Sequence, residues 1–132
     1  PKTKDKSNAL VELIDIYPTL CDLTGLEQPM HLQGKSFLST LDDPQSAHRE
    51  FAYSSYPHRP KGDRPVTGHS LRTDRYRYTE WWEKGSDKVV ATALSDILDD
   101  PGETTSALPG AQRDAERLSK VLRARVLEVR KK

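Results

Sequence analysis

The sequence contains a single cysteine, Cys21, which excludes an internal disulfide bond. It contains no apolar run that approaches the roughly 20 residues of a membrane-spanning helix. Its 21 lysines and arginines nearly balance its 20 aspartates and glutamates, and a formal net charge of +1 gives no overall attraction to nucleic acid or to an anionic membrane. Any basic surface must therefore be local.

Apolar residues are also scarce, because 34% of the residues are hydrophobic while 31% are charged. A chain of 132 residues is long enough for one domain with a modest core. Residues 1–6 are polar and basic with no apolar segment behind them, so we predict no signal peptide. Because the first residue is not methionine, we expect a fragment or a processed piece.

The most informative stretch runs from Gly68 to Trp82 and holds both tryptophans. Tyr76, Tyr78 and Trp82 recur at even spacing, which is the period of a strand with one covered face. Residues 73–75, Thr-Asp-Arg, are suited to a tight turn because aspartate bonds its own backbone there. The stretch therefore predicts a β-hairpin with one aromatic face.

Flanking patterns predict the remaining elements. Asp15 is a suitable helix N-cap, Pro18 fits the first turn and Gly25 ends the helix. Further elements are expected as a short helix at 37–41, strands at 50–56 and 89–97, and an amphipathic helix from 114 to the end. The predicted fold is α+β: a small antiparallel sheet of about four strands, packed by a C-terminal helix, with a short N-terminal helix.

Patterns for metal binding and nucleophilic catalysis are weak. The histidines at 31, 48, 58 and 69 lack the spacing of zinc ligands to one another or to Cys21. Gly34-Lys35-Ser36 is not a phosphate-binding loop, because Pro29 stands where that motif needs glycine. Cys21 lies on a predicted helix among leucines, where a packed and inert thiol is expected.

Five segments in series resemble one family. Residues 13–26, with Asp15, Pro18-Thr19-Leu20 and Gly25, resemble the segment that closes the large domain of sulfatases of the alkaline-phosphatase superfamily. The other four segments are Leu32–Phe37, Ala52–Pro57, Gly68–Thr73 with Tyr76–Tyr78, and Asp96 with Asp100–Thr104. They are most similar to iduronate-2-sulfatase-like members, and the resemblance covers residues 9–108.

The resemblance implies two parts: 1–45, the end of the large domain with a connector, and 46–132, a C-terminal subdomain. It implies a parent sulfuric ester hydrolase that is exported to the periplasm, the extracellular space or the lysosome. The family's formylglycine, made in a Cys/Ser-x-Pro-x-Arg motif, and its calcium would lie in the N-terminal domain. Cys21, followed by Asp-Leu-Thr-Gly, does not fit that motif, so this chain is expected to be inactive and to hold no cofactor.

The resemblance also implies that the subdomain can help wall a cleft for a sulfated sugar or glycosaminoglycan. The proline-rich loop 57–67 and the start of the hairpin bring five basic side chains into one predicted neighbourhood: His58, Arg59, Arg64, His69 and Arg72. Arginine donates two parallel bonds to a sulfate or carboxylate. We therefore predict that His69 and Arg72 contact substrate, with Arg59 as a third residue. The alternative is that Arg72 pairs with Asp74 or Glu80 and only holds the hairpin.

Two further hypotheses stay open. Arginines 72, 75 and 77, interleaved with Tyr76 and Tyr78, suit a polyanion-binding module for glycosaminoglycan or nucleic acid, although the balanced net charge argues against nucleic acid as a partner. A purely structural interaction domain is the other. The resemblance also places Ile16, Leu20 and Leu23 in the large domain, so the first helix lacks its partner here. Its apolar face is expected to fold back onto the sheet or to form an oligomer contact.

Overall fold

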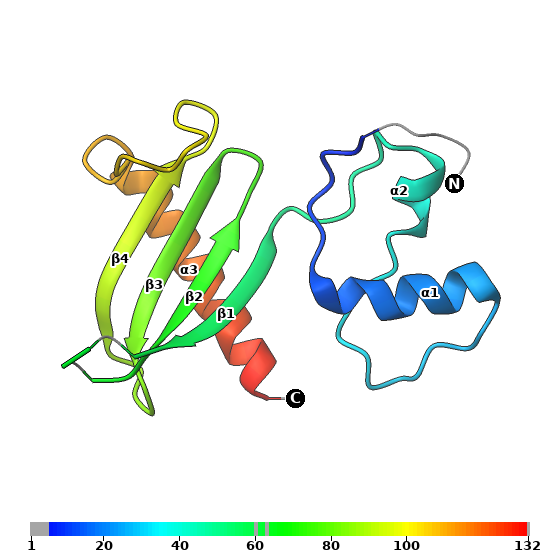
Figure 1. Cartoon of the computed structure of the whole chain (residues 1–132), viewed down its shortest axis with the longest axis horizontal. Coiled ribbons are helices and arrows are strands. Elements are labelled where there is room, and N and C mark those ends of the chain that lie inside the picture. Colours follow the sequence, from blue (N-terminus) through cyan, green and yellow to red (C-terminus); the bar gives the residue numbers. More distant parts are fainter. Residues whose placement is uncertain (1–5, 60, 63, 132) are drawn as a thin grey trace. The chain divides into compact units, whose positions relative to one another are not determined.

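The computed structural model describes residues 6–59, 61–62 and 64–131. Contacts divide the chain into two compact units, Pro1–Ala52 and Tyr53–Lys132 (Figure 1). The predicted division after residue 45, between the end of the large domain and the C-terminal subdomain, stays a prediction. No helix in the described ranges combines the length and the apolar character that crossing a bilayer requires.

The first unit holds three short helical segments: η1 (Leu13–Asp15), α1 (Ile16–Thr24) and α2 (Leu38–Asp42). Gly25 ends α1 with a left-handed φ of 69°, as the sequence predicted. Asp15 stands at the N-cap position of α1, but its side chain does not cap the helix. Its carboxylate has other partners.

Asp15 is the fully buried centre of the first unit. Its carboxylate accepts hydrogen bonds from the backbone N–H groups of Glu12 (2.9 Å) and Lys35 (2.8 Å), from Arg49 Nε (2.8 Å) and from a second Arg49 nitrogen. The His48 ring nitrogen Nε2 lies 3.1 Å away. Burial alone raises the pKa of Asp15, but these hydrogen bonds, with Arg49 first, lower it well below its usual range.

Gly34 of the Gly-Lys-Ser segment allows two backbone segments to approach closely. A Cβ at this position would lie 2.0 Å from the carbonyl oxygen of Ile14, so any residue with a side chain would force the backbones apart. This close approach brings the N–H of Lys35 to Asp15. The Gly-Lys-Ser segment therefore serves packing within the first unit.

The second unit is a sheet with one helix on it (Figure 1). The strands are β1 (Ala52–His58), β2 (Val66–Arg72), β3 (Tyr76–Glu83) and β4 (Val89–Asp96), in the spatial order β1-β2-β3-β4. Helix α3 (Gln112–Arg130) lies across one face of the sheet. The predicted α+β fold, with its antiparallel sheet and C-terminal helix, is confirmed.

The core lies between the sheet and α3. Register places Leu71 opposite Tyr78 and Thr67 opposite Trp82, so these side chains share the face toward the helix. The buried apolar side chains are Leu71, Tyr76, Tyr78, Trp82 and Leu94 of the sheet, with Ala115, Leu118, Leu122 and Val126 of α3. The predicted aromatic face is therefore present and fully used in packing.

Glu80 shares that face, although it is charged, and it is fully buried. Its carboxylate accepts hydrogen bonds from Tyr78 Oη (3.0 Å), Trp82 Nε1 (2.9 Å) and Ser119 Oγ (2.6 Å), and it pairs with Arg123 Nε at 3.3 Å. Burial, together with this neighbouring carboxylate, raises the pKa of Tyr78 to about 12. Glu80 thus ties α3 to β3 through polar contacts inside an apolar layer.

Candidate functional site

His69 lies on the helix-facing side of β2 and is 7% exposed. Its Nδ1 is 2.8 Å from Tyr53 Oη, and its ring meets Trp82 edge to face at 5.2 Å. Burial lowers the pKa of His69, and the positive charge of Arg130 adds to this, while Glu80 opposes it. His69 is thus a neutral core histidine in this chain.

Arg72 lies three residues further along β2, and successive strand residues alternate between faces, so it points to the opposite side of the sheet from His69. Its cross-strand neighbour is another arginine, Arg77. Its Nη1 is buried and has no hydrogen-bond partner in the part of the chain that the structure describes. No ion pair with Asp74 or Glu80 is found within those described ranges.

Arg59 follows the end of β1, and its side chain is exposed. It belongs to the sheet end where β2 begins, whereas Arg72 ends β2. A strand of seven residues spans roughly 20 Å. The structure therefore does not bring His69, Arg72 and Arg59 together, because β2 separates them by face and by length.

The arginine stripe that the polyanion hypothesis needs is largely engaged. Arg75 Nη2 lies 2.8 Å from Asp96 Oδ2, and Arg77 Nη1 lies 3.2 Å from Glu103 Oε1. Tyr76 and Tyr78, the interleaved aromatics, are buried beneath α3. The rings are thus unavailable for stacking on a nucleic acid.

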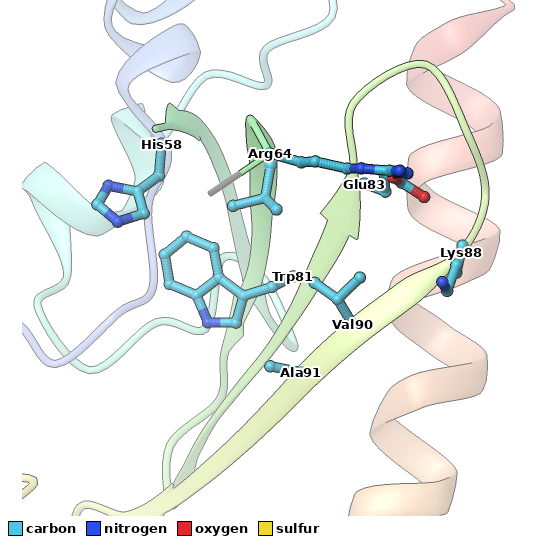
Figure 2. A pocket seen from close by; sticks show the side chains of 8 residues that line it. His58, Arg64, Trp81, Glu83, Lys88, Val90 and Ala91 are labelled. Carbon is cyan, nitrogen blue, oxygen red and sulfur yellow. Dashed lines mark hydrogen bonds and ion pairs between the residues drawn. The ribbon is translucent and has the colours of Figure 1, made fainter. Parts of the chain in front are cut away.

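His58 at the end of β1 and Arg64 just before β2 instead help to form a pocket of about 680 Å³ on the face away from α3 (Figure 2). Small-molecule sites usually measure roughly 300–1,000 Å³. The lining residues are His58, Arg64, Val66, Trp81, Glu83, Lys88, Val90 and Ala91. Of the predicted neighbourhood, His58 and Arg64 reach this pocket.

Trp81 forms the wall of the pocket and is held by its neighbours. Its ring meets Tyr56 edge to face at 5.2 Å and lies 5.5 Å from the ring of His58. A Cβ at Gly68 would come within 2.9 Å of Tyr56 Cζ and 3.0 Å of Trp81 Cζ3. Glycine at position 68 therefore makes room for both rings. Strand alternation in the sequence indicates the position of Trp81. Its place in the strand is out of phase with Tyr76, Tyr78 and Trp82, so its side chain lies on the opposite face of the sheet.

Charges surround this aromatic wall. Arg64 Nη1 donates to Glu83 Oε1 at 2.6 Å, and the Arg64 side chain is 80% exposed. The hydrogen bond from Arg64, with the charge of Lys88, lowers the pKa of Glu83 and keeps it ionised. An aromatic face beside exposed cations is suited to binding a ring that carries negative charge, and the lining includes no hydroxyl or thiol nucleophile.

One segment has the residue spacing of the formylglycine motif, which the resemblance places in the N-terminal domain. Residues 55–59, Ser-Tyr-Pro-His-Arg, have the spacing Ser-x-Pro-x-Arg. Ser55 is exposed on β1. No group of three or more histidine, cysteine, aspartate or glutamate side chains that could hold a metal ion occurs within the described ranges. Ser55 therefore lacks the calcium site that the family's chemistry would place beside it.

The family model described as "N-sulphoglucosamine sulphohydrolase, C-terminal" matches residues 1–132. The chain belongs to this family. Iduronate 2-sulfatase of Homo sapiens is 33% identical over an alignment of 124 positions, which covers 70% of this chain and 22% of the relative. Arylsulfatase K of Mus musculus is 29% identical over an alignment of 106 positions, which covers 74% of this chain and 18% of the relative.

The fold is shared with solved structures of the same kind. A structure described as a 2-O GAG sulfatase matches with a TM-score of 0.59 and 28% identity, over 87% of this chain and 23% of that chain. The predicted resemblance to the sulfatase C-terminal subdomain is thus confirmed. The chain spans about a fifth of the length of these curated relatives.

Proposed function

We propose that this chain is the C-terminal part of a sulfatase, a sulfuric ester hydrolase that acts on a sulfated sugar or glycosaminoglycan. The family match over residues 1–132 carries the proposal. Two relatives, iduronate 2-sulfatase and a 2-O GAG sulfatase, support an iduronate-2-sulfatase-like specificity. On this proposal the chain supports an N-terminal catalytic domain, helps to wall the substrate cleft and has no catalysis of its own.

Calcium and formylglycine would then belong to the catalytic domain. The side chains of the present structure do not fit a metal site, since its described ranges contain no suitable group of ligands. This chain would contribute position and charge only. An exported location, in the periplasm, the extracellular space or the lysosome, belongs to the same proposal.

Arg72 and Arg59 remain our proposed substrate contacts within this role. Arg72 is supported by its buried Nη1, which has no partner in the described part of the chain and suits an acceptor supplied from outside. His69 would first have to give up its 2.8 Å contact with Tyr53. Its proposed part is therefore the weakest of the three.

Kinetics of the full-length parent test these contacts. We expect Arg72→Lys to lower kcat/KM about tenfold, or about 1.4 kcal/mol, with little change in Tm. His69→Ala tests the buried position in the same way. A lower Tm with unchanged kcat/KM of the folded fraction would assign these residues a structural role.

The outer face of α1 is proposed to contact the catalytic domain. Ile16, Leu20 and Leu23 are 45%, 52% and 50% exposed. A second copy of the chain could cover the same face, and light scattering across a concentration series separates these cases. A monomer whose Leu20→Glu variant is equally soluble and stable would count against the second copy.

The proposed function itself is tested by sulfate release. The full-length parent, produced with its modifying enzyme and calcium, should release sulfate from a 2-O-sulfated uronate disaccharide. Disaccharides sulfated only at other positions serve as specificity controls. No release from any of them would reject the sulfatase proposal.

A further inference from the structure

We propose that the pocket around Trp81 binds one sugar unit of an anionic carbohydrate. The sugar ring lies against the indole, and its sulfate or carboxylate faces Arg64, Lys88 and His58. The inference rests on the proposed function for its substrate class, while the pocket itself is an observation of this chain. It assigns a role to His58 and Arg64, which are not among the predicted site residues.

The wall is suited to a flat ligand. Trp81 projects from the sheet face opposite α3, and Val90 and Ala91 continue the apolar surface beside it (Figure 2). Tyr56 packs edge to face against the indole, and Gly68, which has no side chain, leaves room for this packing. A ring that is already immobilised loses little freedom when a ligand stacks on it.

Hydrogen-bond donors around this wall are available. Trp81 Nε1 has no hydrogen-bond partner among the described residues, whereas Trp82 Nε1 is bound to Glu80. The nitrogens of His58 likewise have no partner within the described ranges. Sugar hydroxyl groups accept such bonds, so an indole N–H beside an open aromatic wall favours a carbohydrate over a purely apolar ligand.

The charges favour an anionic sugar. Arg64 uses one arm of its guanidinium on Glu83, and its remaining N–H groups face solvent because the side chain is 80% exposed. Lys88 adds a second positive charge to the lining. The ionised Glu83 neutralises one of these two charges, which leaves net positive charge beside the indole. This positive charge attracts a sulfate or a uronate, and the attraction weakens as the salt concentration rises.

Titration of the 132-residue chain with a sulfated heparin tetrasaccharide tests the inference by two-dimensional ¹H–¹⁵N NMR. We expect the indole N–H signal of Trp81 to shift while that of the buried Trp82 stays in place. A neutral tetrasaccharide should bind at least tenfold more weakly. Equal binding of single-stranded DNA would show that charge alone is responsible and would overturn the proposal.

Matched variants locate the site. Trp81→Ala should weaken binding at least tenfold and Arg64→Ala several-fold. Arg117→Ala is the control, because Arg117 is an exposed arginine that also pairs with a carboxylate, but on α3. Val90→Glu adds a negative charge at a side chain that is 49% exposed, so it should weaken binding with an unchanged Tm. Loss of binding in Arg117→Ala, or full binding in Val90→Glu, would contradict the inference.

Failure of the inference differs from failure of the proposed function. If the parent releases sulfate but the NMR titration leaves Trp81 unshifted, the pocket proposal is wrong and the sulfatase proposal stands. If the chain binds the tetrasaccharide through Trp81 but the parent releases no sulfate, the reverse holds. The two experiments therefore answer separate questions.

Discussion

The two units of this chain are stabilised in opposite ways. In the second unit, Leu71, Leu94, Leu118 and Leu122 are at most 1% exposed, and one charged side chain, Glu80, sits among them. The fully buried centre of the first unit is a carboxylate.

Apolar side chains of the first unit lie mostly outside. Leu13 is 85% exposed, Leu26 66% and Met30 103%. A small unit with few buried apolar groups thus depends on a charged hydrogen-bond network for its structure. A sheet and helix with a covered apolar face instead tolerate one buried carboxylate that links them.

The largest effect is expected when the centre of the first unit is removed. Asp15→Ala leaves Arg49 and two backbone N–H groups without their acceptor. Removing one partner of a buried pair costs about 3–5 kcal/mol, so we expect the first unit to unfold while the second stays folded. Hydrogen exchange resolved along the chain measures this, with Asp22→Ala on the exposed side of α1 as the control. Retained protection in α1 would contradict the comparison.

The reciprocal change is Glu80→Ala in the second unit. It leaves Tyr78 Oη, Trp82 Nε1 and Ser119 Oγ without a shared acceptor, and we expect a loss of about 2–3 kcal/mol. The apolar core should still hold the sheet and α3 together at a lower Tm. Near-ultraviolet circular dichroism reports on this because both tryptophans lie in β3. Unfolding in Glu80→Ala but not in Asp15→Ala would invert our interpretation.

A smaller effect is expected from acid. The pKa of His69 is lowered from its usual 6.5, so below pH 6.5 the unfolded chain binds a proton at His69 more readily than the folded chain does. The stability of the fold is therefore unaffected by His69 above pH 6.5 and decreases as pH falls from 6.5 toward the lowered pKa. Because the pKa of Asp15 is lowered, the stabilisation by its ionised carboxylate is lost only as pH falls below about 3.8. The second unit should therefore weaken first on acidification.

Thermal melts between pH 8 and pH 4 measure this difference. In His69→Gln the decline of Tm below pH 6.5 should be reduced, because glutamine does not titrate. An unchanged decline would assign the acid sensitivity to another group.

Local chemistry allowed most of the fold to be predicted from the sequence. Gly25 ends α1, and the even spacing of Tyr76, Tyr78 and Trp82 defines the covered face of β3. These signals depend on a few neighbouring residues, so chain order alone carries them. The apolar stripe of α3 is of the same kind.

The site was harder to predict because it depends on strand parity and length. His69 and Arg72 are close in sequence, yet alternation sends them to opposite faces. A position on the covered face ordinarily requires an apolar residue, so the sequence does not predict that Glu80 is buried there. The contacts between Asp15 and Arg49 join residues 34 positions apart, and no local pattern announces such a pair.

The smallest expected effect is none: the chain should not hydrolyse an aryl sulfate. Each unit offers one residue for the family's nucleophile, Cys21 in the first and Ser55 in the second. Cys21 is buried, 4% exposed, and outside the motif. Ser55 is exposed and within it, but the described ranges contain no metal-ligand group to stabilise the developing charge. Sulfate release with added calcium should therefore equal the buffer blank.

Intact-mass analysis checks whether Ser55 loses two hydrogens, as conversion to formylglycine requires. Turnover abolished by Ser55→Ala and retained in Cys21→Ala would give the second unit a catalytic role and make the units differ in chemistry as well as in packing.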